Sequence, residues 1–429
     1  MKQIYTVLFA CAVLFAQAQN YTSFFTGNTE DVSPEPLGGL VLMGGATEND
    51  QAMQWFLEKA NGGDVVVIRA SGSDGYNNYL YNQLGVMVNS VETIVLNNAA
   101  AADDPYVIQQ IENAEALWIA GGNQWTYINE WRDAGVMDAI NYLLNEKGAV
   151  VGGTSAGMAV LGGTYFTAQF GTVQSGAALN NPLGSNVALG HGDFLQAPYM
   201  ENVVTDQHYN NPDRRGRHFT FMARIEHDLS ERAFGIASDE YTAVCVESDG
   251  TARAFGDYPD YDDFVYFLQS NCQQGGPEVL EASTPLTWNR DNKAVQVYKV
   301  PATNAGQNFF DLNNWHTGEG GSWQKWWAVN GELFIDEEGT EPDCEVTGVP
   351  LLDAETWKVF PTITHTNVQV MGEDGNWHWQ LYDLNGRIVK RGQVSGNRTD
   401  IAISDAPSGL YLLEIVFNGN MRRYKIIRP

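Results

Sequence analysis

Apolar runs alternate with helix-like patterns between residues 36 and 160. The apolar runs predict five strands, at Gly39–Met43, Val65–Arg69, Thr93–Leu96, Leu117–Ala120 and Ala149–Val151. Helix-like segments lie between them, near residues 48–60, 106–115 and 124–146. The second run has no polar alternation, which is typical of a parallel strand covered on both faces. We therefore expect a doubly wound α/β fold with a mostly parallel sheet and its chemistry at the carboxyl ends of the strands.

From about residue 350 the pattern changes to short alternating segments. They lie at residues 358–361, 377–382, 383–386, 409–416 and 424–427. Asn385-Gly386 and Asn418-Gly419 are typical hairpin turns. This region predicts a small all-β sandwich.

Charge divides the chain in the same way. The 429 residues carry a formal net charge of −28, but residues 353–429 contain eight acidic and nine basic side chains. We expect a first domain at 19–335, a polar linker at 336–352 and the β-sandwich at 353–429. Such acidity excludes a nucleic-acid binder, because that affinity comes mainly from Lys and Arg. A cationic substrate would be attracted.

Residues 1–18 have the pattern of a secretory signal peptide. Lys2 precedes an apolar run that ends at Phe15, and Ala16-Gln17-Ala18 forms a small-x-small cleavage site. The run is shorter than the roughly 20 residues that span a bilayer. We expect an exported, soluble protein. In an oxidising compartment Cys272 and Cys344 are candidates for a disulfide, whereas Cys245 lies in an apolar segment and is expected to be a buried thiol.

Gly153-Thr-Ser-Ala-Gly157 has the G-x-S-x-G form of a nucleophile elbow. It follows an apolar strand and precedes a short helix-like segment. A sharp turn there would push the Ser155 hydroxyl out of the sheet edge and place the amide of Ala156 near a developing oxyanion. The alternative is a glycine-rich turn with an incidental serine.

A nucleophilic serine needs a base and a group that orients the base. Two of the seven histidines fall in the tail, and the remaining candidates are His191, His208, His218, His227 and His316. Asp239 and Glu240 follow an apolar strand and are candidates for the orienting acid. The residue patterns alone do not choose among these.

Four ordered motifs resemble those of the cyanophycinases, a serine peptidase family that also includes alpha-aspartyl dipeptidases. They are Gly121-Gly-Asn-Gln124, the pentapeptide around Ser155, Asp206-Gln-His208 followed by arginines, and Asp239-Glu-Tyr-Thr-Ala243. The resemblance covers about residues 36–335 and implies a fold similar to class I glutamine amidotransferases. It implies Ser155 as nucleophile, His208 as base and Glu240 as orienting acid, although Asp239 stays open for the last role.

The same resemblance implies further roles in the site. Gly122 and Ala156 would donate backbone N–H groups to the oxyanion, Gln124 would line the site, and no metal or organic cofactor would be needed. The residues implied in substrate binding are Asp206, Gln207, Arg214, Arg215 and Arg217. An arginine can grip a substrate carboxylate with two hydrogen bonds, and Asp206 can receive a guanidinium. The alternative for the arginines is neutralisation of nearby surface carboxylates.

The implied substrate is cyanophycin, a polyaspartate that bears arginine on its side chains, or a similar Asp- and Arg-rich peptide. The rival interpretations are an aspartyl or isoaspartyl exopeptidase, an inactive surface-binding module, and an α/β-hydrolase that uses His316. The oligomeric state stays open, with a homodimer as one option.

Two other features have simple interpretations. Residues 257–263 are acidic, but they lack the EF-hand spacing and favour a solvated loop over a calcium site. Trp315, Trp323, Trp326 and Trp327 favour packing over sugar binding.

The tail resembles the C-terminal type A sorting domain of type IX secretion. The resemblance covers about 75 residues and includes Lys358-Val-Phe-Pro361, Pro407-Ser-Gly-Leu-Tyr411 and Arg422-Arg-Tyr-Lys-Ile-Ile427. It implies secretion machinery as a partner and a secreted or cell-surface location.

Overall fold

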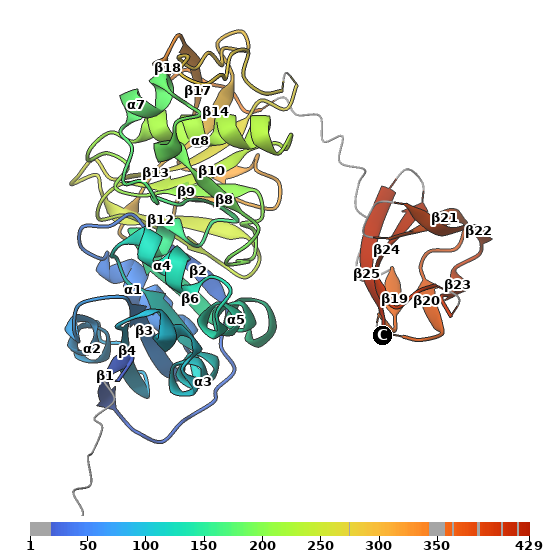
Figure 1. Ribbon diagram of the computed structural model, residues 1–429, viewed down its shortest axis with the longest axis horizontal. Coiled ribbons are helices and arrows are strands. Elements are labelled where there is room, and N and C mark those ends of the chain that lie inside the picture. Colours follow the sequence, from blue (N-terminus) through green and yellow to red (C-terminus); the bar gives the residue numbers. More distant parts are fainter. Residues whose placement is uncertain are drawn as a thin grey trace, which may run out of the picture. The chain divides into compact units, whose positions relative to one another are not determined.

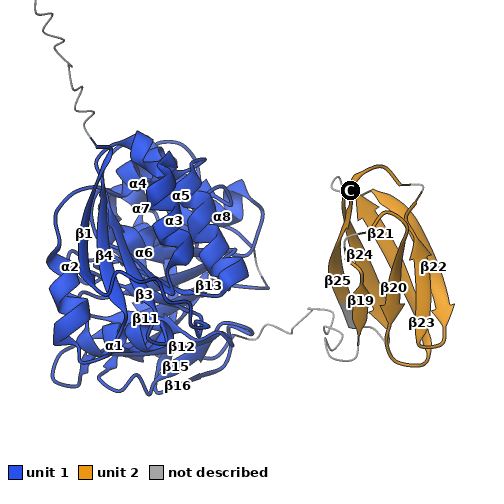
Figure 2. Ribbon diagram, turned by 90° about the horizontal axis from the view of Figure 1, so that it is seen from below, with its two compact units in different colours: residues 1–342 blue, residues 343–429 orange. Residues whose placement is uncertain are grey.

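The computed structural model describes residues 19–273, 275–342, 357–362, 364–383, 387–404, 406–417 and 420–429. The predicted signal peptide, Cys344 and both predicted hairpin turns lie outside these ranges. The chain divides into two compact units, with the division between Pro342 and Asp343 (Figure 2). No helix in the described ranges is long and apolar enough to cross a bilayer.

Unit 1 contains a ten-stranded sheet with a parallel centre. The five parallel strands, in spatial order, are β4 (Ser90–Leu96), β3 (Asp64–Arg69), β5 (Ala116–Ile119), β6 (Val150–Thr154) and β2 (Gly39–Met43). They correspond to the five predicted strands. Antiparallel strands complete the sheet: β1 (Tyr21–Gly27) beside β4, then β11 (Ala243–Val246), β12 (Thr251–Tyr258), β15 (Phe309–Asp311) and β16 (Gly318–Glu319) beyond β2.

The helices of unit 1 connect these strands. They are α1 (Asp50–Lys59), α2 (Gly75–Asn78), α3 (Pro105–Asn113), α4 (Gln124–Trp131), α5 (Gly135–Tyr142), α6 (Ala156–Ala159), α7 (Ser175–Asn180) and α8 (Arg215–Asp228). The helix-like segment at 124–146 is interrupted, because Arg132 is extended and Asp133 has a φ of +61°. α4 and α5 are therefore separate helices.

A second, eight-stranded sheet lies within unit 1 and is mostly antiparallel. Its spatial order is β18 (Glu332–Asp336), β17 (Ser322–Val329), β14 (Val295–Pro301), β13 (Phe264–Ser270), β10 (Phe234–Ser238), β9 (Val203–Asp206), β7 (Thr164–Phe166) and β8 (Leu189–His191). β10, β9 and β7 run parallel to one another. Figure 1 shows the parallel strands of the first sheet, blue to green, at one end of unit 1 and the second sheet, green to orange, at the other.

One buried apolar cluster joins the two sheets. It contains Leu42 and Ile119 from the first sheet and Ile236 and Phe267 from the second. Because the sheets share this core, the carboxyl ends of β6 and β9 belong to one compact unit. These strand ends carry the residues discussed below.

Unit 2 is all-β and consists of two antiparallel sheets. The three-stranded sheet contains β19 (Lys358–Phe360), β20 (Asn367–Met371) and β23 (Arg398–Ala402). The four-stranded sheet contains β22 (Ile388–Ser395), β21 (Asn376–Asp383), β24 (Gly409–Phe417) and β25 (Asn420–Arg428). Trp357 and Trp377 are buried in the apolar core of this unit.

Candidate active site

Ser155 lies in a sharp turn between β6 and α6. Its backbone has φ +53° and ψ −113°, a region that side-chain-bearing residues rarely adopt. The turn needs both flanking glycines. A Cβ at Gly153 would lie 2.5 Å from the carbonyl carbon of Gly157, and a Cβ at Gly157 would clash with the backbone of Ile119. The strand–turn–helix context of the pentapeptide is therefore present.

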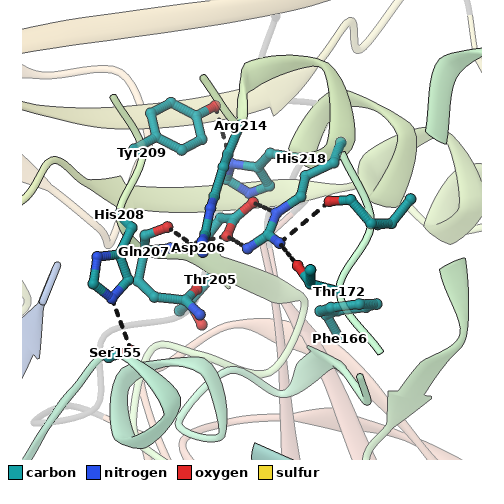
Figure 3. A network of polar contacts seen from close by, with 12 residues as sticks. Ser155, Phe166, Thr172, Thr205, Asp206, Gln207, His208, Tyr209, Arg214 and His218 are labelled. Carbon is teal, nitrogen blue, oxygen red and sulfur yellow. Dashed lines mark hydrogen bonds and ion pairs between the residues drawn. The ribbon is translucent and has the colours of Figure 1, made fainter. Parts of the chain in front are cut away.

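A chain of hydrogen bonds links Ser155, His208 and Glu240. His208 follows β9, and its Nε2 lies 2.9 Å from Ser155 Oγ (Figure 3). Its Nδ1 lies 2.7 Å from Glu240 Oε1. Glu240 follows β10, and its second oxygen accepts a hydrogen bond from Asn211 Nδ2 at 3.1 Å. The three side chains come from three distant segments and meet where the carboxyl end of β6 in the first sheet lies near those of β9 and β10 in the second.

The protonation of this chain follows from its partners. Although partial burial opposes ionisation, the hydrogen bonds from His208 and Asn211 hold the pKa of Glu240 below its usual value. An ionised carboxylate accepts hydrogen bonds, so His208 Nδ1 carries a proton and donates to it. Nε2 then has a lone pair directed at the Ser155 hydroxyl.

Asp239, the other candidate acid, is oriented differently. Its Oδ2 accepts a hydrogen bond from the N–H of Phe264 at 3.3 Å, and its Oδ1 is buried without a hydrogen-bond partner in the described part of the chain. Burial raises the pKa of Asp239 to about 7. Of the two adjacent acids, Glu240 faces the imidazole.

The other candidate histidines have different partners. His191 contacts Thr164, His227 contacts Asp228, and His316 contacts Glu341. His218 is buried in α8 next to the hydroxyl of Tyr209, and burial lowers its pKa to about 4. His208 is therefore the histidine that the structure brings to Ser155.

A pocket of about 420 Å³ opens beside Ser155 and His208. Gly122 and Ala156, the two predicted oxyanion donors, both line it. The hydroxyl of Tyr127 donates to the carbonyl oxygens of Ala120 and Gly121, at 2.9 and 3.1 Å, and fixes the loop before α4. The remaining lining residues are Asn123, Gln124, Trp125, Phe166, Ala168, Gln169, Gly171, Thr172, Gln207, Arg214 and Arg217.

Two glutamines in the pocket differ in their contacts. Gln124 donates from Nε2 to the backbone oxygen of Phe166, so this amide braces the pocket wall. Gln207 is only 6% exposed, and its Oε1 has no hydrogen-bond partner among the described residues. A buried acceptor without a partner is costly, so this oxygen is available to a ligand or a water molecule in the pocket.

The arginines predicted to bind substrate separate into three environments. Arg217 forms a two-point ion pair with Asp206, and both side chains are at most 2% exposed. Because they neutralise each other, neither presents a free charge to the pocket. Arg215 pairs with Asp213 on the surface and does not line the pocket.

Arg214 is the third case. It lines the pocket and donates from one terminal nitrogen to the backbone oxygen of Gln207 at 3.0 Å. Burial and the nearby charge of Arg217 lower its pKa to about 10, so it is positive at neutral pH. No carboxylate in the described ranges forms an ion pair with it. The pocket therefore offers a positive group to an anionic ligand.

Several contact residues were not predicted from the sequence. Asn211 holds Glu240, Phe166 and Trp125 line the pocket, and the turn Gly44-Gly45 contacts the His208 segment. The glycine pair after the first predicted strand was a visible signal for the last of these. In the described part of the chain, no group of three or more His, Cys, Asp or Glu side chains could hold a metal ion.

An α/β fold with a serine–histidine–glutamate chain beside a pocket is typical of hydrolases. Residues 40–251 match Peptidase family S51, and residues 358–428 match the secretion system C-terminal sorting domain. The chain thus carries a peptidase family S51 domain and a type IX sorting domain. The sorting domain supports a secreted or cell-surface location.

Two named relatives and one solved structure are similar to this chain. A cyanophycinase of Synechococcus elongatus is 26% identical over 227 residues, which is 51% of this chain and 66% of the relative. A cyanophycinase of Trichormus variabilis is 25% identical over 177 residues, 41% of this chain and 53% of the relative. The chain therefore spans less than two thirds of the length of these relatives. A crystal structure of a peptidase from an acI-B1 Actinobacterium is 16% identical, with a TM-score of 0.41, and covers 55% of this chain and 91% of its own.

Proposed function

We propose that this protein is an exported serine-type peptidase that cleaves aspartyl peptides, with Ser155 as nucleophile, His208 as base and Glu240 as the orienting acid. The observation that carries the proposal is the continuous pair of hydrogen bonds from Ser155 Oγ through His208 to Glu240, at 2.9 and 2.7 Å. Membership of residues 40–251 in a peptidase family supports it.

The mechanism follows from the protonation of the chain. His208 Nε2 takes the proton of Ser155 as Oγ attacks the scissile carbonyl carbon, and Glu240 stabilises the imidazolium. The oxyanion accepts hydrogen bonds from the backbone N–H groups of Gly122 and Ala156. The amine then leaves with the proton from His208. Water, deprotonated by His208, attacks the acyl-enzyme, and Ser155 recovers its proton when the acid product leaves.

The pocket supports a substrate that carries a carboxylate close to the scissile bond. Arg214 supplies a positive charge, and the Gln207 oxygen supplies an acceptor for a substrate N–H. Charge-assisted hydrogen bonds of this kind are about twice as strong as neutral ones. A substrate that offers both groups is a β-linked or α-linked aspartyl peptide. In cyanophycin the aspartate side chains are amidated by arginine, so the carboxylate that Arg214 would bind there is the free α-carboxylate of that arginine. The curated relatives are named cyanophycinases.

Product analysis tests this proposal. The purified protein is incubated with cyanophycin granules and with a panel of aspartyl and isoaspartyl dipeptides, and products are identified by mass spectrometry. Release of β-aspartyl-arginine from the granules is expected. Cleavage of dipeptides alone would favour the exopeptidase alternative, and no cleavage of either would favour a binding module.

Two substitutions test the roles proposed for Ser155 and His208. Ser155→Ala and His208→Gln should each lower kcat by a factor of roughly 10⁴ to 10⁶, and the double variant should lose little more. His227→Gln is the matched control, because His227 is exposed and contacts Asp228 instead. A His208→Gln enzyme with the activity of the His227→Gln control would contradict the proposed base.

A further inference from the structure

The turn Met43-Gly44-Gly45 at the carboxyl end of β2 contacts all three segments of the site. Its three consecutive carbonyl oxygens each accept one backbone hydrogen bond. Met43 accepts from the N–H of Ser155 at 3.1 Å, and Gly44 accepts from the N–H of His208 at 2.7 Å. Gly45 accepts from the N–H of Tyr241, the residue after Glu240, at 3.1 Å.

The three residues that donate to this turn share an unusual backbone. Ser155, His208 and Tyr241 have φ values of +53°, +48° and +64°. Each such conformation is strained for a non-glycine residue and persists where surrounding contacts hold it. The bonds to residues 43–45 are contacts of this kind. One turn of β2 therefore holds the strained backbone beside each of the three side chains.

The composition of the turn fits this role. A Cβ on Gly44 would clash with the backbone oxygen of Asp239. Gly45 has a φ of +111°, and a Cβ there would lie 2.5 Å from both Nε2 and Cε1 of His208. The bare Cα of Gly45 therefore lies against the imidazole edge that faces Ser155. A larger residue would turn that edge away.

We propose that residues 43–45 form the positioning element of the site, which fixes the spacing of Ser155, His208 and Glu240, and that Gly45 sets the orientation of the His208 ring. The assignment of these three side chains rests on the proposed function. Gly45 is a positioning residue, because it acts on the imidazole and is not among the residues that line the pocket.

Gly45→Ala tests the proposal, with Gly62→Ala as control. Gly62 also has a positive φ, +82°, but nothing lies within 4 Å of an added Cβ, so it carries the backbone strain without the contact. In Gly45→Ala, kcat should fall by roughly 100-fold or more, because displacement of a reacting group by about 1 Å costs that much. KM should stay within about threefold, since the pocket is unchanged.

Two further measurements accompany the kinetics. The rate of fluorophosphonate labelling of Ser155 should fall by the same factor as kcat, normalised to the folded fraction from circular dichroism. The Nδ1–H proton resonance of His208, assigned with His208→Gln, should shift in Gly45→Ala and stay unchanged in Gly62→Ala. This resonance reports ring orientation even in an inactive protein. An unlabelled wild type would contradict the proposed function, while the resonance would still test the turn.

A second variant covers a Gly45→Ala protein that does not fold. Tyr241→Gly keeps the N–H but removes the strain that the bond to Gly45 maintains, and Tyr241 is half-exposed, so the fold should survive. Because glycine can leave this backbone conformation freely, Glu240 is held less firmly, and kcat should fall roughly fivefold or more at unchanged KM. The proposal is overturned if Gly45→Ala folds and keeps the wild-type kcat and resonance, or, where Gly45→Ala does not fold, if Tyr241→Gly keeps both.

Discussion

Arg214 and Arg215 are neighbours in sequence but meet different partners. Arg214 lines the pocket beside Ser155 and has no carboxylate partner in the described ranges, whereas Arg215 is neutralised by Asp213 on the surface. A charged group in a pocket can form a charge-assisted hydrogen bond with the ligand, while an exposed ion pair contributes little free energy. This pair therefore separates the effect of a pocket charge from that of total charge.

Arg214→Gln should raise KM for an aspartyl substrate roughly 10- to 100-fold, because a charge-assisted hydrogen bond is lost. kcat should change much less. Arg215→Gln removes the same charge one residue away and should leave KM within about twofold. Steady-state kinetics on one aspartyl dipeptide measures both. Equal KM values for the two variants would show that Arg214 does not bind the substrate carboxylate.

Asp239 predicts a pH dependence of stability. Burial raises its pKa from 3.8 to about 7 in the folded protein. Between these values the unfolded chain releases the proton and the folded protein keeps it, so the free energy of unfolding falls as pH rises. A shift of about 3 pKa units corresponds to an upper bound of about 4 kcal/mol. The full contribution is present below pH ~4 and is lost by pH ~8.

Asp239→Asn should remove this dependence. Asparagine stays neutral, and its oxygen can accept the same hydrogen bond from Phe264. The Tm difference between this variant and the wild type should therefore increase from pH 4 to pH ~8 and level off above. Asp260→Asn, at an exposed position, is the control. Thermal denaturation across this pH range measures both, and a difference that stays constant with pH would show that Asp239 is ionised throughout.

At the scale of elements, the parallel strands were predictable because they are buried on both faces. A run such as Val65–Ile68 is apolar at every position because both faces of the strand are buried. Its assignment as a strand therefore needs no knowledge of the strands that it pairs with. The second sheet was not predicted. Most of its strands between Thr164 and Asp336 pair across long sequence separations, which no local pattern specifies. The exception is the β17–β18 hairpin, which closes at Asn330-Gly331.

The same distinction applies to the site. Ser155 was predictable because its turn is encoded by adjacent glycines. The choice of Glu240 over Asp239 was not, because both residues leave the same strand and the choice depends on Asn211, 29 residues away. The Asp206–Arg217 pair likewise bridges β9 and α8. Its formation depends on the rotation of α8, and a motif-based assignment left both charges free for substrate.

The tryptophan-rich segment shows packing where a sugar site was the alternative. Trp315 and Trp326 are buried, and Trp315 packs against Phe267 and Phe310. Trp327 stacks on Phe334 at a centroid distance of 5.7 Å. These tryptophan rings therefore pack against other aromatic side chains of the protein.

At the scale of the whole molecule, the site and the sorting domain belong to different units. Each residue assigned to the site lies before the division at Pro342, and the sorting domain begins at residue 358. The two functions should therefore be separable. The point of truncation matters, because Cys272 is disulfide-bonded and Cys344, its predicted partner, lies outside the described residues. A chain that ends at residue 352 keeps both cysteines.

A protein truncated after residue 352 should keep kcat and KM within about twofold of the full chain, because unit 1 has its own core and contains the whole proposed site. When it is expressed in a host with type IX secretion, it should stay inside the cell envelope, while the full chain reaches the surface or the medium. Activity assays on cell fractions measure both effects at once. Ser155→Ala in the full chain is the converse control, because this variant should be inactive but still exported.

Loss of activity in the truncated protein would show that residues beyond 352 support the site. Export without the tail would show that the sorting domain is not the signal that carries this enzyme out.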